Sequence, residues 1–349
     1  MKALQYHGPW QLTLEDLPEP VMSPDEVLIR SEAVGICGSD VHGYTGESGR
    51  RKAGMVMGHE AAGTVVKVGA NVSNLKEGDE VAIFPTLGCG KCKYCLAGNE
   101  HICPEKRIIG VNSGTWGAMA EFFTCNARQA VRLSEKVDPA IALLAEPLAV
   151  SLHAINRMKP EKDAILAIVG AGTIGLALTV VLKSLGHQNI FILDKIDEKL
   201  AFAKELGAEP INIDREDALK FISAKTGGQR AAGVFEAVGA ASTVKAAFDL
   251  CDFGGTVILI GNLAKEFTLP LQGVTSNETT LRGTYGFNRK EFGEAVQIAQ
   301  KNQKVLQKFI TGSCTLEEAP KVMEELAKGS RQAMKIVIRP QEQAACVHA

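Results

Sequence analysis

The feature that most restricts the fold is the segment GAGTIG at residues 170–175, which stands between two apolar stretches. The run AILAIVG that leads into it has the composition of a buried parallel strand. The stretch that follows, through Leu185, has the length of a helix, and a second strand, NIFILD, comes at 189–194. A strand, a glycine turn, a helix and a strand predict a βαβ unit, which requires a parallel sheet with helices on its faces.

The same alternation continues to about Tyr285. After the charged amphipathic helix DEKLAFAKELG, the pattern predicts the strand EPINI, a helix over 217–225, the strand AGVFEAVG ending at Gly239, a helix over 242–251, and a strand over 254–261. Strands and helices in this order are typical of a doubly wound parallel sheet. We therefore expect a complete dinucleotide-binding domain of the Rossmann type over residues 151–287.

The segments before and after this domain have a different pattern of residues. Residues 1–150 are rich in Gly, Pro and short β-branched runs, which predict a mainly β domain; the clearest strands are at 26–30, 61–69 and 79–84. Residues 288–349 predict helices over EAVQIAQKN and LEEAPKVMEELAKG and a strand over KIVIRP, before a frayed end, QEQAACVHA. The fold class is therefore α/β, with a β domain beside the parallel sheet.

Charge and hydropathy limit the partners. Lys and Arg number 38 against 40 Asp and Glu, so the net charge is −2 with both signs scattered, and no nucleic-acid or membrane surface is expected. No leader opens the chain, and charge or glycine breaks the apolar stretches before the ~20 residues that a membrane span needs. We expect a cytoplasmic protein whose partners are small molecules and other subunits.

The cysteines point to a metal. Four of the nine crowd together as Cys89, Cys92, Cys95 and Cys103. Four thiolates at such short spacings can close a tetrahedron around Zn²⁺, so a structural zinc lobe is predicted over residues 88–104. The alternatives are four unrelated loop thiols and a redox CxxC motif, but no thioredoxin-like βαβ pattern surrounds the cluster to support the latter.

The glycine turn predicts a nucleotide. Gly170 and Gly172 let the backbone approach a pyrophosphate, and Gly175 opens the helix whose N-terminus faces that charge. Asp194 ends the next strand, where a carboxylate accepts hydrogen bonds from an adenosine ribose. The alternative is a tight turn between strand and helix that binds no ligand.

A second metal set is dispersed along the chain. It comprises Cys37 in GICGSDVH, His59 and Glu60 in MGHEAAG, and Glu146 in AEPLAV. A thiolate, an imidazole and a carboxylate form a zinc site that leaves one position open for water or substrate. Taken singly, Cys37 is more often a core residue, His59 a turn residue and Glu146 a carboxylate at a helix start.

Together these motifs resemble the zinc-containing medium-chain dehydrogenases, and within them the sorbitol and threonine dehydrogenase group. GICGSDVH, GHEAAGTVVKVG, the four-cysteine lobe, AEPLAV and GAGTIG occur in that family's order over nearly the whole chain. The resemblance implies a GroES-like β catalytic domain, a Rossmann domain after it, and a C-terminal segment that returns to the catalytic domain, with the active site in the cleft.

The resemblance also implies residue roles. Cys37 and His59 match catalytic zinc ligands, while Glu60 and Glu146 match carboxylates that bind the metal or hold its water. Ser39 matches the hydroxyl that takes the substrate proton, with Asp40 as an outer partner and His42 as the outer member of a proton relay. His153 is expected to be a packed structural residue. The residues expected to bind the cofactor NAD are Gly170, Gly172, Thr173, Ile174, Gly175, Asp194, Lys199, Val238 and Gly239.

The implied function is oxidation of a secondary hydroxyl of a small polyol to the ketose, with NAD and two Zn²⁺ per chain, in a homotetramer or homodimer. L-Threonine is an alternative substrate, and so is a phosphorylated polyol that Arg50, Arg51 and Lys52 would meet, unless that triplet is a solvated loop. A zinc-free quinone reductase would lack both ligand sets. A non-catalytic NAD(P)H-binding structural or regulatory protein is the alternative outside enzymes.

The sequence departs from the sorbitol group in two places. Relatives commonly read GGFAEY where this chain has an altered segment at 114–122, and Gly286 lies about where sorbitol dehydrogenases carry a substrate-side arginine. Both departures bear on which alcohol the enzyme would accept.

Overall fold

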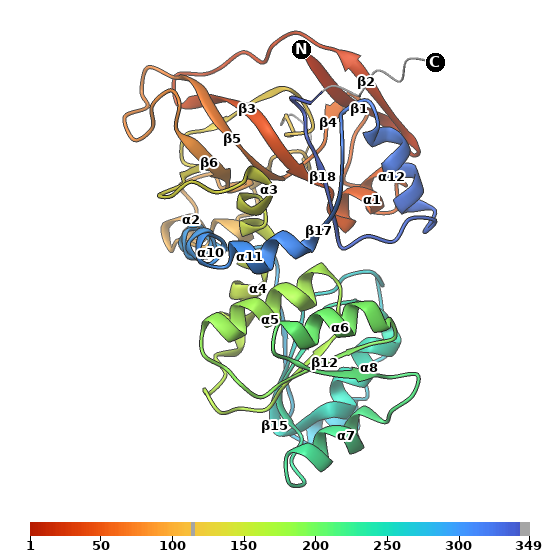
Figure 1. The fold of residues 1–349 in the computed structure, drawn as a ribbon. Coiled ribbons are helices and arrows are strands. Elements are labelled where there is room, and N and C mark those ends of the chain that lie inside the picture. The colour runs from red at the N-terminus through yellow and green to blue at the C-terminus, as the bar shows by residue number, and fades with distance from the viewer. Residues whose placement is uncertain (113–115, 343–349) are drawn as a thin grey trace. The chain divides into compact units, whose positions relative to one another are not determined.

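A computed structural model describes residues 1–112 and 116–342, which form two compact units. One unit combines Met1–Glu146 with Asn288–Ala349, and the other is Pro147–Phe287 (Figure 1). Part of the altered segment at 114–122 and most of the predicted frayed end lie outside the described residues.

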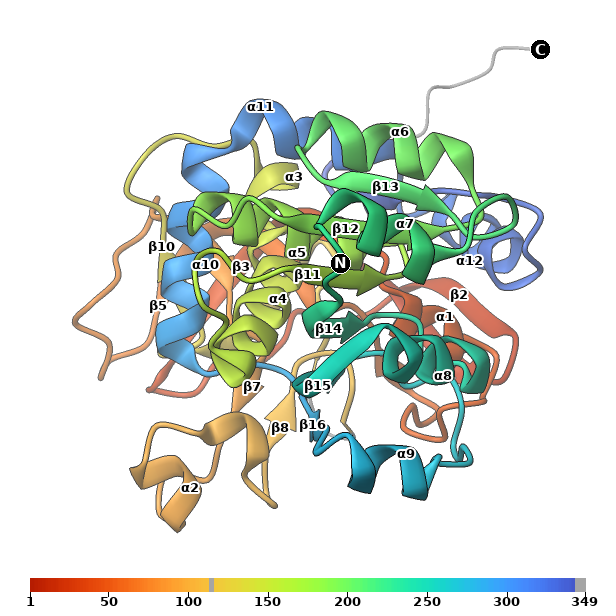
Figure 2. The ribbon, with the colours of Figure 1, turned by 90° about the horizontal axis from the view of Figure 1, so that it is seen from below.

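The second unit is built on a six-stranded parallel sheet. Its strands are β11 (Leu166–Val169), β12 (Ile190–Asp194), β13 (Glu209–Asn212), β14 (Ala231–Glu236), β15 (Cys251–Leu259) and β16 (Thr280–Gly283). They lie side by side in the order β13-β12-β11-β14-β15-β16, which Figure 2 shows from below. The order reverses between β11 and β14, where open parallel sheets bind their ligands.

Helices cover this sheet on both faces. They are α5 (Thr173–Ser184), α6 (Asp197–Glu205), α7 (Ala218–Lys225), α8 (Ala241–Leu250) and α9 (Leu271–Ser276). Figure 1 shows α5 and α6 on one face and α7 and α8 on the other, as right-handed crossovers away from β11 in both directions require. All four residues of β11 are buried, because both faces of the strand are covered. The predicted α/β doubly wound architecture is confirmed.

The first unit is mainly β, around the ten-residue strand β3 (Glu26–Gly35). Its main sheet runs β10-β6-β5-β3-β18-β17, and β9 also pairs with β3. These strands are β5 (Glu60–Val68), β6 (Glu80–Ile83), β9 (Phe122–Asn126), β10 (Ala130–Arg132), β17 (Ile310–Cys314) and β18 (Lys335–Ile338). Two smaller sheets join β1 (Lys2–Gly8) to β2 (Gln11–Asp16) and β4 (Met55–Val56), and β7 (Thr86–Leu87) to β8 (Arg107–Ile108).

The segment after Asn288 completes the core of the first unit. Helix α10 (Arg289–Lys301) begins at a capping box in which Asn288 and Glu291 bond each other's backbone N–H groups. The Phe292 ring on α10 packs against that of Phe84, with 5.7 Å between the ring centroids. Both rings are almost fully buried, which stabilises the fold by about 1.5–3 kcal/mol for each ring. The helices α11 (Gln303–Leu306) and α12 (Ala319–Ala327) follow.

One apolar stretch is longer than the sequence analysis expected. The stretch 139–158, which contains α3 (Pro139–Ala142) and α4 (Ala145–Met158), has the length and the mean hydropathy, 1.3, of a membrane span. We expected charge or glycine to break every apolar stretch before the ~20 residues of a span, but too few charges fall within this one to exclude a span by composition. In the structure, 78% of its most apolar window is buried, which is the usual position of such a helix in a folded core.

Candidate functional site

Cys37 lies in the turn that joins β3 to α1 (Gly38–Tyr44), as the residue that begins the helix. Its N–H donates to Oδ2 of Asp40 across 3.2 Å, and the Asp40 N–H donates to the Cys37 carbonyl across 2.9 Å. This reciprocal pairing is how an acidic residue at the third helical position fixes a helix start. The thiol of Cys37 therefore has a set position just beyond the end of β3.

His59 and Glu60 lie where β5 begins, opposite the end of β3. Glu60 pairs directly with Gly35 across the two strands. A Cβ on Gly35 would lie 2.4 Å from Oε2 of Glu60, so glycine is needed there to make room for the carboxylate. One ligand atom from each of Cys37, His59 and Glu60 lies within 4.8 Å of the other two. A thiol, an imidazole and a carboxylate at this separation fit an open zinc site.

Asp40 is buried behind His59. Its Oδ1 lies 3.4 Å from Nδ1 of His59 and accepts a hydrogen bond from Nη2 of Arg51 across 2.9 Å. Burial acts to raise the pKa of Asp40, but the charges and hydrogen bonds of His59 and Arg51 outweigh it and lower that pKa. Burial likewise acts to lower the pKa of His59, and the Asp40 carboxylate raises it well above the usual value. A carboxylate behind a ligand imidazole orients the ring.

Glu60 has a further partner that sequence reasoning missed. Nζ of Lys335, the first residue of β18, donates to Oε2 of Glu60 across 2.5 Å and to the carbonyl of Ile36 across 3.3 Å. Both charged side chains are about 97–98% buried. The only local signal for this contact is a lysine at the start of the apolar strand KIVI.

Glu146 lies in the first turn of α4 and is outside the group of three ligand atoms. Burial raises its pKa to about 7, and the nearby charge of Glu60 adds to the effect. Ser39 lies closer, since its Oγ is 3.4 Å from Nε2 of His59. His42 lies further along α1, at a partly exposed position, where its Nδ1 is 2.9 Å from Oε2 of Glu47. The structure therefore gathers Cys37, Ser39, His59 and Glu60, with Glu146 beside them.

The basic triplet at residues 50–52 is not a uniform solvated loop. Arg50 and Lys52 are exposed, but the side chain of Arg51 is 2% exposed and is paired with Asp40. Gly43 makes this burial possible, because a Cβ there would lie 2.7 Å from Cγ of Arg51. Nothing in the local sequence distinguishes Arg51 from its basic neighbours, so its structural role was missed. Arg51 is therefore unsuited to meeting a substrate phosphate.

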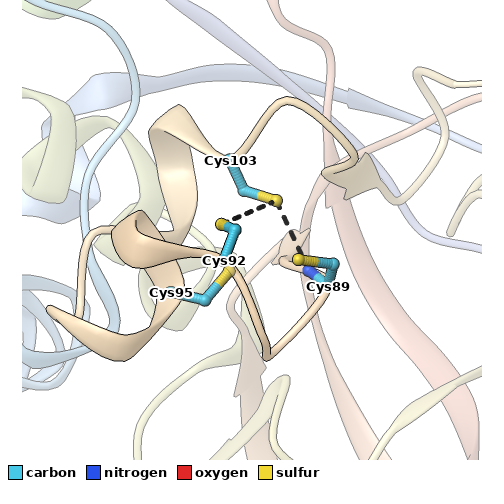
Figure 3. A group of neighbouring side chains, drawn as sticks. All are labelled: Cys89, Cys92, Cys95 and Cys103. Atoms are coloured by element: carbon cyan, nitrogen blue, oxygen red, sulfur yellow. Dashed lines mark hydrogen bonds between the residues drawn. The ribbon is translucent and has the colours of Figure 1, made fainter.

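The predicted cysteine lobe brings its four thiols together (Figure 3). One ligand atom from each of Cys89, Cys92, Cys95 and Cys103 lies within 4.8 Å of all the others. The Cys92 thiol lies 3.8 Å from that of Cys103, and Cys92 begins the short helix α2 (Lys93–Leu96). Backbone N–H groups of Lys91 and Cys92 lower the pKa of Cys89 to about 7. Four thiols that converge in this way fit a closed structural zinc site.

The glycine turn of the second unit has the close backbone packing that a nucleotide loop needs. A Cβ on Gly175 would lie 1.8 Å from the carbonyl oxygen of Gly170, so only glycine fits there. Gly170 has φ +102°, which also favours glycine. Gly172, at the start of α5, has no atom within 4 Å of its Cβ position, which leaves that face open. Thr173 and Ile174, in the first turn of α5, are partly exposed.

Asp194 closes the turn from the end of β12. Its Oδ2 accepts a hydrogen bond from the Ala171 N–H across 2.8 Å, and its Oδ1 accepts from the N–H groups of Lys195 and Ile196. A carboxylate accepts about four hydrogen bonds, so these three leave capacity on Oδ2. The carboxylate therefore both holds the glycine turn and retains a site for one hydroxyl. Lys199, on α6, is partly exposed.

Val238 and Gly239 follow β14, which ends at Glu236 and not at Gly239 as the sequence predicted. The strand ends early because the Glu236 carboxylate turns back along the chain. Its Oε1 accepts hydrogen bonds from the N–H groups of Val238 and Gly239 and from the Thr243 hydroxyl. A buried carboxylate thus fixes the loop beside β11, and sequence reasoning did not single it out. Gly239, with φ +85°, packs against the backbone of Gly261.

Two protein families match the chain. Residues 23–135 match the alcohol dehydrogenase GroES-like domain, and residues 173–301 match the zinc-binding dehydrogenases. The chain is 34% identical to the L-threonine 3-dehydrogenase of Bacillus subtilis (strain 168), over 97% of this chain and 99% of that protein. It is also 34% identical to a sorbitol dehydrogenase of Bombyx mori, over 96% of this chain and 97% of that protein.

Solved structures share the whole fold. An oxidoreductase/dehydrogenase of unknown specificity from Escherichia coli superposes with a TM-score of 0.90 at 29% identity, over 98% of this chain and 99% of that one. An alcohol dehydrogenase from E. coli CFT073 with bound NADH superposes with a TM-score of 0.88 at 27% identity. A candidate zinc-binding dehydrogenase from Sinorhizobium meliloti 1021 with bound NADP superposes with a TM-score of 0.87 at 26% identity. The last two each cover 97% of this chain and 99% of the other.

Proposed function

The chain belongs to the zinc-dependent medium-chain dehydrogenases, and from that premise we propose that it oxidises a secondary hydroxyl of a small polyol to the ketose with NAD⁺. Members of this family are oxidoreductases that act on small molecules with zinc and a nicotinamide nucleotide. The observation that carries the proposal is the convergence of Cys37, His59 and Glu60 on one point, with a hydroxyl, Ser39, beside them.

We propose that Cys37 and His59 hold the catalytic metal, with Glu60 or Glu146 as the carboxylate. Zinc at this site would supply a Lewis acid that favours the alkoxide form of the substrate, and NAD⁺ would accept the hydride. Ser39 would take the hydroxyl proton of the substrate, and His42 would be the outer residue that releases a proton to water. The partial exposure of His42 and its contact with Glu47 suit a group that exchanges protons with water.

For the second unit we propose that the turn Gly170–Gly175 binds the pyrophosphate and that Asp194 binds the adenosine ribose. The open face at Gly172 and the remaining capacity of Asp194 Oδ2 support this assignment. The same surface would extend along α5 and α6 through Thr173, Ile174 and Lys199. The loop at Val238 and Gly239 would contact the nicotinamide end of the cofactor. The four thiols of the lobe would hold a second, structural zinc.

The polyol rests on the resemblance to sorbitol dehydrogenases, of which the Bombyx mori protein is one. L-Threonine is the second candidate, because the B. subtilis threonine dehydrogenase is equally similar. A phosphorylated polyol is third, since the pairing of Arg51 with Asp40 leaves only Arg50 and Lys52 exposed in the basic triplet. The departure at Gly286 has a backbone cause: its φ of +57° favours glycine over arginine.

A panel of alcohols with NAD⁺ tests the substrate class. We expect kcat/KM to be highest for one of sorbitol, xylitol and galactitol, and lowest for 2-propanol. A site that bonds several hydroxyls rejects an alcohol that lacks them by up to ~10⁴-fold, because its buried polar groups are then unpaired. A clear preference for threonine would favour the second candidate, and a preference for 2-propanol would contradict both. Galactitol 1-phosphate in the same panel tests the third.

The resemblance also supports a homotetramer or homodimer in the cytoplasm. Sedimentation equilibrium of the purified protein would measure the number of subunits, and fractionation of the producing cells would measure the compartment.

A further inference from the structure

The metal cluster of the first unit contains a buried carboxylate, Glu60, whose charged partner comes from a distant part of the chain. Glu60 is buried, Glu146 lies near it at a partly exposed position, and the Cys37 thiol becomes a thiolate when it binds a metal. Asp40 is paired with Arg51 and with His59. Among the described residues, the side chain that forms an ion pair with Glu60 is Lys335, at 2.5 Å. A buried carboxylate with no partner is strongly destabilising, so this cation matters most when no metal ion is present.

The position of Lys335 follows from the pairing of strands. Strand β18 lies antiparallel to β3, with Val337 opposite Gly35 and Ile338 opposite Val34. Gly35 is also the residue opposite Glu60 on β5. The strand that leads to Cys37 is therefore flanked on one side by Glu60 and on the other by the strand that begins with Lys335. The carbonyl of Ile36 accepts a second hydrogen bond from the lysine, which restricts the ammonium group further.

We infer that Lys335 is a positioning residue for the catalytic metal site: it offsets the charge of Glu60 in the metal-free protein and holds that carboxylate, so that the ligand cluster is folded before a metal ion enters. The inference rests on the proposed function, in which Cys37, His59 and a carboxylate bind the metal. A divalent cation supplies positive charge of its own, so the need for Lys335 falls once the metal is bound.

This role differs from that of an ordinary structural ion pair in one measurable way. If Lys335 acts through charge, Lys335→Met destabilises the metal-free protein more than the loaded protein. By thermodynamic linkage, a change that harms only the metal-free state makes metal binding tighter. A lysine needed only for packing would give the same loss of stability in both states and leave the affinity for metal unchanged.

The test uses the full chain, dialysed against a chelator until the zinc of the open site is lost and the zinc of the four-thiol lobe is retained. Thermal melting is then followed with and without Co²⁺, and the Co²⁺–thiolate absorption is titrated to obtain the Kd. The variants are Lys335→Met, Lys335→Arg, and Lys335→Met combined with Glu60→Gln. The control is Lys328→Met, since Lys328 is an exposed lysine of the same segment, paired with Glu324.

We expect Lys335→Met to lower the Tm of the metal-free protein. Saturating Co²⁺ should recover most of that loss of Tm. The Kd of the variant for Co²⁺ should be lower than that of the wild type by roughly tenfold or more. Lys335→Arg should behave like the wild type, and adding Glu60→Gln to Lys335→Met should restore the Tm of the metal-free protein. Equal losses of Tm with and without Co²⁺, or no rescue by Glu60→Gln, would overturn the inference.

Two further outcomes are informative. If Lys335→Met does not fold, the double variant still decides: it folds if charge is the cause, and it fails if packing is. If the wild type shows no Co²⁺–thiolate absorption on titration, the open site binds no metal and the proposed function itself fails. If the wild type shows the Co²⁺–thiolate absorption but Lys335→Met changes neither the Tm nor the Kd for Co²⁺, only the role given to Lys335 is overturned.

Discussion

The Arg51 guanidinium and the Asp40 carboxylate form an ion pair at 2.9 Å in which the side chains are 2% and 0% exposed. Asp40 in turn lies 3.4 Å from Nδ1 of His59 and bonds the N–H of Cys37. One carboxylate thus contacts both residues that we propose as metal ligands on this side of the site. Arg51 and His59 together offset the cost of burying this carboxylate.

Replacing Arg51 should therefore harm both stability and activity. Arg51→Met leaves Asp40 buried without its closest charged partner, and breaking a buried pair in this way costs about 3–5 kcal/mol. Urea denaturation measures the free energy of unfolding, and dehydrogenase assays measure the activity. Arg50→Met, at the exposed neighbouring position, is the matched control and should change neither. Wild-type stability in Arg51→Met would show that the pair contributes no net stabilisation.

We predict two zinc ions per chain with separate roles. Cys95→Ser should lower the Tm and the solubility, because the lobe at residues 88–104 would depend on a closed metal site. Cys37→Ser should leave the Tm nearly unchanged and remove activity. Elemental analysis of each variant should show loss of a single zinc. Fully active wild-type protein with only one zinc per subunit would contradict the prediction.

The proton path predicts unequal effects at two positions of α1. Ser39→Ala should reduce kcat by orders of magnitude, because in the proposed relay the hydroxyl beside His59 takes the substrate proton directly. His42→Ala should reduce it less, since water can replace an outer relay member. The rate of alcohol oxidation should rise with pH in the wild type, because a proton leaves with each hydride. Small and equal effects of both substitutions would rule out the relay.

Asp194 predicts a preference for NAD⁺ over NADP⁺. Its carboxylate would accept a ribose hydroxyl and repel a 2′-phosphate, although Lys195 and Lys199 weaken that repulsion. Asp194→Asn should reduce the ratio of kcat/KM for NAD⁺ to that for NADP⁺, and Asp214→Asn, at an exposed position, should not. A higher kcat/KM with NADP⁺ in the wild type would show that the carboxylate has another role, such as holding the Ala171 N–H.

The second unit was largely predictable from sequence because its signals are local. Strands β11 and β12 are buried on both faces and therefore read as unbroken apolar runs, and the glycine turn after β11 is a contiguous motif. The four cysteines were predictable for the same reason, since their spacing alone brings the thiols together. The end of β14 was misplaced because a side chain, Glu236, and not a glycine, turns the chain there.

The contacts that support the open metal site could not be predicted in this way. Lys335 meets Glu60 through a strand pairing between segments far apart in the chain, and no local pattern specifies that pairing. Arg51 looks like its neighbours in sequence, and only the fold of α1 and Gly43 shows that it is buried. The family resemblance suggested the ligands that we propose, while the charged residues around them could be found only in the structure.

The main sheet of the first unit is assembled from both ends of the chain, with β18 added beside β3. During synthesis, the ribosome completes every strand of the second unit before it reaches Lys335. The parallel sheet can therefore form while the first unit still lacks its last strand and its buried lysine. A nascent chain that is stalled shortly before Lys335 would carry a complete parallel sheet and a first unit in which Glu60 still lacks its lysine partner.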